Sequence, residues 1–239
     1  MPERGLPKER AWERSPVLEP RATGRVPELI SDGGGLPFAP GALDGSPAPL
    51  QEGDPAVAAL IAHLTSRTAP KRSRFKRGPA PSPPPPSLAG WRLLARTEEE
   101  ALFGRGLPPE LITVAVRLER RRAAWSCFAE SSARPLRAAR DGIRASSWRP
   151  DPSTEVPDDA TTLRLLLTEQ TFAGGQRASG RILAPDLYVG PEELVLTMYV
   201  MPLPGFKARS PNPETPVRVL LPEPIGPREL VDGALYERT

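Results

Sequence analysis

The chain has 239 residues, with 33 prolines, 20 glycines, only 5% aromatic residues and a formal net charge of +3 at pH 7. The single cysteine excludes an intrachain disulfide framework and any cysteine-based zinc cluster. The single histidine excludes sites that need two imidazoles.

The N-terminus and the hydropathy of the chain bear on its location. The first residues, MPERGLPKERAWER, are charged and broken by proline where a secretion signal would have an apolar core. No window of about 18 apolar residues is present, so we expect no transmembrane segment. The expected location is the cytoplasm, unless Met1 is a misassigned start that hides a signal or a membrane segment.

Residues 1–88 hold 17 of the 33 prolines, and these interrupt most of the segment. Proline lacks an amide donor and pushes the preceding residue away from the α region, so this spacing disfavours helices and sheet ladders. The segment also has too little apolar material to offset the entropy of ordering it. We therefore predict a disordered, proline-rich tail over residues 1–88 and a folded domain over residues 89–239.

One short helix is predicted inside this tail, over residues 54–67 (DPAVAALIAHLTSR). Asp54 is a favourable N-cap, and a proline at the first helical position suits a helix start. Val57, Leu60, Ile61 and Leu64 form one apolar stripe. A helix of this length is marginal alone in water, so it needs a partner surface, either in this chain or in another molecule. His63 lies off the stripe, and we expect it to be solvated.

A basic block follows the helix, and it carries charges without neighbouring acids. Its members are Arg67, Lys71, Arg72, Arg74, Lys76 and Arg77. Such a block could neutralise the phosphates of a nucleic acid, with Phe75 stacking on a base, or it could lie on an anionic membrane surface. No recognised nucleic-acid motif accompanies it, and a solvated linker remains the simpler interpretation.

From Trp91, the expected first core residue, short apolar runs recur between turn residues at intervals of roughly ten, a pattern typical of antiparallel β proteins. The predicted strands are Trp91–Arg96, Leu111–Leu118, Ala123–Ala129, Pro135–Ala139, Gly142–Trp148, Thr161–Glu169, Ser179–Leu183, Glu193–Met201 and Val217–Leu221. Asp141-Gly142 between two of these runs is a strong hairpin signal. Residues 159–172 could form a strand or a capped helix, and the alternating leucines favour a strand. We predict a mainly β fold, an antiparallel sandwich-like or barrel-like domain.

The residues that usually carry catalysis do not form a recognisable site. His63 is far in sequence from the serines of the folded domain, and no nucleophile-elbow motif is present. Cys127 lies in an apolar run, where a buried, inert thiol is expected. No cofactor or metal motif occurs. The sequence leans away from an enzyme, although an enzyme with an unrecognised site remains an alternative.

Two polar loops in the last third are the most distinctive local features. One contains the Gly-Gly-Gln-Arg stretch of residues 174–177, and the other contains the Asn-Pro-Glu-Thr-Pro stretch of residues 212–216. The residues that could form a binding surface there are Glu169, Gln170, Gln176, Arg177, Arg181, Asn212 and Glu214. The leading hypothesis is therefore a non-enzymatic module that binds an unknown protein partner or a ligand, and the alternative is that these loops only cover a sheet edge.

The same region carries a resemblance to a family. The stretches TEQTFAGGQRASGRILAPDLYV and VLTMYVMPLPGFKARSPNPETPVRVLLPEPIGPRELVDG resemble the C-terminal module of uncharacterised, envelope-associated proteins of high-GC bacteria, over roughly residues 145–236. In many of those proteins a cysteine precedes each of the two loops, and the resemblance implies that these cysteines form a bridge. The matching positions here are Phe172 and Arg209, so the bridge is absent, which suits a reducing compartment. The resemblance implies a fold and no activity.

Overall fold

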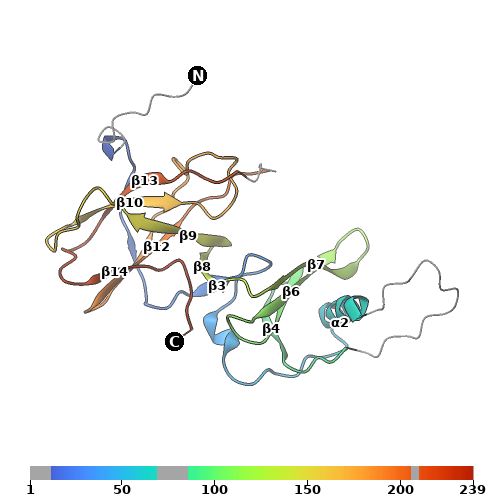
Figure 1. Ribbon diagram of the computed structural model, residues 1–239. Helices are drawn as coiled ribbons and strands as arrows, with labels where there is room; N and C mark the ends of the chain where they lie inside the picture. The colour runs from blue at the N-terminus through green and yellow to red at the C-terminus, as the bar shows by residue number, and fades with distance from the viewer. Residues whose placement is uncertain (1–11, 69–85, 206–209, 239) are drawn as a thin grey trace. The chain divides into compact units, whose positions relative to one another are not determined.

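The computed structural model describes residues 12–68, 86–205 and 210–238, and these residues fold mainly into β-strands (Figure 1). The prediction of a mainly β fold is confirmed. The chain divides into two compact units, which we describe separately. The helix unit comprises residues 31–136, and the sheet unit comprises residues 1–30 and 137–237.

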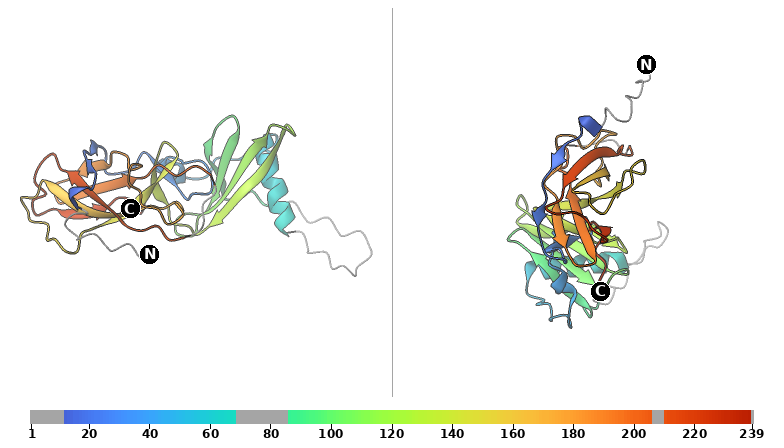
Figure 2. Two further views of the ribbon diagram at one scale, coloured as in Figure 1. Left: turned by 90° about the horizontal axis from the view of Figure 1, so that it is seen from above. Right: turned by 90° about the vertical axis from the view of Figure 1, so that its left-hand side faces the viewer.

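The helix unit combines a four-stranded antiparallel sheet with one α-helix and one 3-10 turn in its described residues. Its elements are η1 (Pro40–Leu43), α2 (Pro55–Thr68), β4 (Trp91–Arg96), β5 (Glu100–Arg105), β6 (Ile112–Glu119) and β7 (Ala124–Ser132). The strand order is β4-β5-β6-β7, so each strand pairs with the next one along the chain. Helix α2 lies along one face of this sheet (Figure 2).

Helix α2 begins where the sequence predicts. The carboxylate of Asp54 accepts a hydrogen bond from the amide of Ala56 (2.8 Å), which satisfies one of the free amides of the first turn. The apolar stripe faces the sheet, where Leu60 is fully buried in one core with Phe103 and Trp91. The predicted helix is confirmed, and its partner is the protein's own sheet.

The opposite face of the sheet is covered by the segment that contains Asp32 and Gly35. Asp32 is buried, and its carboxylate accepts hydrogen bonds from the hydroxyls of Thr113 and Ser131. A Cβ atom at Gly35 would lie 2.8 Å from the Cβ atom of Ala115, so only glycine fits at this contact. The four-stranded sheet therefore has a covering layer on each face.

The sheet unit contains one curled, mixed sheet. Its strands are β1 (Val17–Leu18), β2 (Arg21–Ala22), β3 (Leu29–Ser31), β8 (Arg137–Arg140), β9 (Ile143–Pro150), β10 (Thr162–Thr168), β11 (Asp186–Val189), β12 (Glu193–Tyr199), β13 (Thr215–Leu220) and β14 (Glu229–Asp232). The order is β1-β13-β10-β9-β12-β11-β2, with β14 beside β12, and β8 beside β9 and β3. The pairs β1–β13, β2–β11 and β12–β14 are parallel.

The core of the sheet unit comes from alternating strand positions. The fully buried members are Leu163, Leu165, Leu167, Leu196, Met198, Val217 and Val219. The indole of Trp148 closes the core on one side and donates its N–H to the carbonyl of Leu196 (2.8 Å). This alternation leaves the intervening side chains of β10 and β13 on the outer face of the sheet.

The prediction of disorder over residues 1–88 needs correction for residues 12–68. In this part of the chain Ile30, Phe38 and Leu43 are almost fully buried. Proline lacks an amide donor but keeps its carbonyl acceptor, and the carbonyl of Pro16 accepts a hydrogen bond from the amide of Arg218 (2.9 Å). Prolines beside short edge strands are therefore compatible with ordered pairing. Residues 1–11 and 69–85 lie outside the described residues.

Most predicted strands are present with shifted ends. The open segment is a strand, β10, and β8 and β9 form the hairpin expected at Asp141-Gly142, where both residues have positive φ (51° and 76°). The predicted strand Ser179–Leu183 is wrong, because it holds only an isolated bridge from Ile182 to Val200. Strands β5, β11 and β14 were not predicted.

Candidate functional site

The two predicted polar loops meet at one end of the sheet unit. We call this region the loop end and define it as residues 169–181, which follow β10, residues 201–205, which follow β12, and residues 210–214, which lead into β13. Since β10 and β13 are neighbours in the sheet, their connecting loops start side by side (Figure 1).

A buried ion pair holds the loop end together. The guanidinium of Arg181 binds both carboxylate oxygens of Glu169, with Nη1–Oε1 at 2.7 Å and Nη2–Oε2 at 2.5 Å. The side chains are 15% and 2% exposed, and the hydrogen bond to Glu169 raises the pKa of Arg181. Nη1 of Arg181 also donates to the carbonyl of Met201 (2.6 Å). One side chain therefore joins two of the three segments.

Asn212 joins the third segment to the first. Its side-chain amide donates to the carbonyls of Glu169 (3.1 Å) and Thr171 (2.5 Å), and its oxygen accepts from the amide of Ala173 (3.0 Å). The hydroxyl of Thr215 accepts a further hydrogen bond from the amide of Ala178 (2.8 Å). These bonds give the loops a defined shape without regular secondary structure.

The seven residues predicted for this surface therefore have different roles. Glu169, Arg181 and Asn212 are brought together as the internal frame of the loops. Gln170, Gln176 and Arg177 are exposed. The remaining residue, Glu214, forms an exposed pair with Arg149 (2.7 Å) outside the frame, and this hydrogen bond lowers the pKa of Glu214.

Two apolar residues of the loop end were missed as site residues. Phe172 is 53% exposed and Met201 is 47% exposed, among the most exposed large hydrophobic side chains of the described chain. Both flank the buried pair, since Phe172 lies three residues after Glu169 and the carbonyl of Met201 binds Arg181. A large apolar residue beside a Gly-Gly turn is a weak signal, but it could have suggested an exposed position for Phe172.

The basic block is described only at Arg67, and its other five members lie outside the described residues. Arg67 forms an ion pair with Glu130 of β7, which also contacts Nε2 of His63 (3.0 Å). The prediction of a solvated His63 is wrong, because its side chain is 19% exposed and lies against β7. Burial, together with the nearby charge of Arg67, lowers the pKa of His63.

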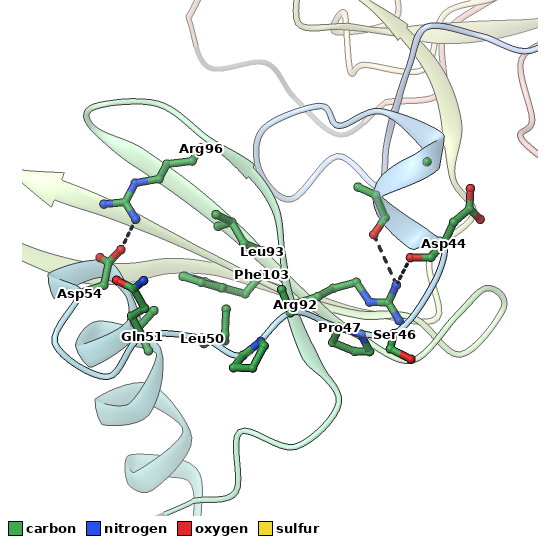
Figure 3. Close-up of a pocket in the computed structure, with 15 residues that line it drawn as sticks. Asp44, Ser46, Pro47, Leu50, Gln51, Asp54, Arg92, Leu93, Arg96 and Phe103 are labelled. Carbon is green, nitrogen blue, oxygen red and sulfur yellow. Dashed lines mark hydrogen bonds and ion pairs between the residues drawn. The ribbon is translucent and has the colours of Figure 1, made fainter.

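A cavity of about 390 Å³ lies beside β4 in the helix unit (Figure 3). Leu50, Leu93 and Phe103 contribute apolar walls. Nη1 of Arg92 donates to the carbonyl of Leu43 (2.8 Å), and Arg96 forms an ion pair with Asp54. That hydrogen bond lowers the pKa of Asp54, the residue that caps α2. Both arginines thus tie the segment before α2 to the edge of the sheet.

The groups needed for catalysis are not assembled among the described residues. The thiol of Cys127 is half-buried on β7, and burial raises its pKa, which disfavours the reactive thiolate. No cluster of three or more His, Cys, Asp or Glu side chains in the described ranges could hold a metal ion. No described helix combines the length and hydropathy needed to cross a membrane.

Comparisons of the chain with protein-family models, with curated proteins and with solved structures find no match. The resemblance to the module of envelope-associated proteins stays a prediction.

Proposed function

We propose that this chain is a non-enzymatic interaction protein whose loop end binds a protein partner. The observation that carries the proposal is the combination of a hydrogen-bonded frame and two exposed apolar side chains, Phe172 and Met201. Binding residues commonly lie on loops that a rigid scaffold positions. A loop whose shape is already set loses little conformational entropy when a partner binds.

The chemistry of the loop end indicates the kind of partner surface that it fits. Aromatic, methionine and arginine side chains are enriched in protein interfaces. Arg177 is exposed and forms no ion pair with the described residues, while the carboxylates of Glu169 and Glu214 are already bound by arginines. The exposed part of this surface is therefore apolar with a positive margin. Its partner should present an apolar side chain next to a carboxylate.

Site-specific photo-crosslinking tests this proposal. A photoreactive phenylalanine analogue at Phe172, in the full chain and in its native cells, should give one dominant crosslinked species. The same analogue at Val189, which is 39% exposed on β11, should not give that species. The crosslink at 172 should be lost when Arg177→Glu reverses the charge beside it.

Binding of the crosslinked partner to purified chains provides the second measurement. We expect Met201→Asp to weaken this binding at least about tenfold, because a carboxylate would be buried without a counter-ion. Val189→Asp is the matched control and should leave the affinity unchanged. Equal crosslinking at both positions, or equal affinity of both Asp variants, would exclude the loop end as the interface.

A further inference from the structure

Two arginines on the outer face of the sheet unit stand directly opposite each other. In the register of the antiparallel pair β10–β13, Arg164 is the partner of Arg218 (Figure 1). The residues on either side of each arginine are fully buried in the core, so both guanidiniums project from the other face. Like charges directly opposite on neighbouring strands are destabilising. The arrangement therefore needs a compensating interaction.

The contacts of the two guanidiniums do not supply a counter-ion. Arg218 donates from Nε to the hydroxyl of Ser15 and from Nη2 to its carbonyl, both at 3.2 Å. Arg164 lies over the ring of Trp12, 5.7 Å from its centre. Neither guanidinium forms an ion pair with a carboxylate within the described ranges of the chain.

Two acids lie near the pair, and neither of them bridges it. Asp151 is close enough for the charge of Arg164 to lower its pKa, together with its own hydrogen bonds. Its carboxylate is bound instead by the amide and hydroxyl of Ser153 (3.0 and 2.8 Å). Glu13 is exposed and forms no ion pair among the described residues.

The two arginines, Trp12 and Glu13 line a cavity of about 240 Å³. We propose that this cavity binds a phosphate group, as inorganic phosphate or a small phosphomonoester. A guanidinium matches the oxygens of a phosphate with two parallel hydrogen bonds, and a tetrahedral dianion presents oxygens to both arginines at once. The ligand supplies the missing negative charge between Arg164 and Arg218. This site is separate from the loop end and does not depend on the function proposed for it.

Titration of the full chain with inorganic phosphate, followed by calorimetry at constant ionic strength, tests the proposal. We expect saturable binding to one site, weakened by at least about tenfold in Arg164→Gln, because a charge-assisted hydrogen bond is lost. Arg164→Lys keeps the charge without the planar fork and should lie between the wild type and Arg164→Gln. Glu13→Gln removes a nearby negative charge and should tighten binding about twofold.

A matched control and two further probes make the result decisive. Arg120→Gln removes the same charge from an exposed turn of the helix unit and should bind phosphate as the wild type does. Glycerol 3-phosphate should compete with phosphate for the site. The proposal is overturned if the wild type shows no saturable binding, or if Arg164→Gln and Arg120→Gln bind equally. It is also overturned if a DNA duplex or anionic phospholipid vesicles bind at this cavity and phosphate does not displace them.

Discussion

Buried arginine–carboxylate pairs fasten the sheet unit at two separate places. One is the pair of Glu169 and Arg181 in the loop end. The other joins Arg140 to Asp186 (2.6 Å), where the guanidinium also lies 4.4 Å from the ring centre of the buried Tyr199. Removing one partner from a buried pair leaves a charge without solvent or a counter-ion. These residues therefore matter for stability more than the many exposed pairs do.

Glu169→Gln tests the frame of the loop end. We expect a loss of about 3 kcal/mol in the free energy of unfolding, because the guanidinium of Arg181 keeps its burial and loses its carboxylate. Glu214→Gln makes the same chemical change in the exposed pair with Arg149, and solvent screening should leave the stability nearly unchanged. Urea denaturation followed by circular dichroism compares the two variants. Equal transition midpoints would show that the buried pair does not hold the loops.

Gly35→Ala tests the tight contact on the second face of the four-stranded sheet. The added methyl would lie 2.8 Å from Cβ of Ala115, an atom that cannot move without the backbone of β6. We expect a loss of about 1–3 kcal/mol from overpacking. Gly53→Ala is the control, because a Cβ there has no atom within 4 Å. If thermal denaturation gives the same midpoint for both variants, the covering segment does not pack as described.

The loop-end residues show which parts of the site could be predicted from sequence. Polar residues in two loops that follow neighbouring strands could be expected to lie close together. The division into a buried frame and an exposed surface could not be predicted, because it depends on which side chain meets which. Arg181 and Arg177 are alike in sequence, yet one is bound to a buried carboxylate and the other is exposed.

At the scale of whole elements, periodicity was a good guide where each strand or helix has its own pattern. Helix α2, the β8–β9 hairpin and strand β10 follow directly from apolar spacing and turn residues. The short strands β1 and β2 have no such pattern. Their order comes from pairing with β13 and β11, which lie far along the chain, and a local pattern cannot contain that information.

Helix α2 carries the only histidine, and this makes its docking sensitive to pH. His63 faces Glu130 on β7 and has Arg67 on its own helix, and Arg67 already binds Glu130. Burial and Arg67 together hold the pKa of His63 below its usual value of 6.5. The unfolded chain therefore binds more protons than the folded chain just below pH 6.5, and stability rises with pH through that window.

We expect the free energy of unfolding to decrease between about pH 7 and pH 5 in the wild type, because this range contains the ordinary histidine pKa and lies above those of carboxylates. His63→Gln should remove most of that slope, since no other histidine is present. Urea titrations at several pH values measure it. A slope of opposite sign would mean that the attraction of Glu130 outweighs burial and Arg67.

At the scale of the whole molecule, the chain order and the division into units do not coincide. The sheet unit is built from both ends of the chain, whereas the helix unit is one continuous segment, residues 31–136. A boundary at residue 88 was predicted from the change in composition, and it would separate α2 from the sheet that it covers. Composition reports local entropy and hydropathy, but it does not report which segment buries which surface.

Expression of two fragments tests the continuous unit. Residues 31–136 should unfold cooperatively on their own, because both faces of the β4–β7 sheet keep their covering layers. Residues 89–136 contain the same four strands without α2 and without the Asp32–Leu43 segment. That fragment should aggregate or show no cooperative transition, since Phe103, Val114 and Leu102 would lie exposed. Scanning calorimetry and gel filtration compare the two. If the shorter fragment unfolds with the same cooperativity, the sheet does not depend on these layers, and a folded core beginning near Trp91 becomes the correct description.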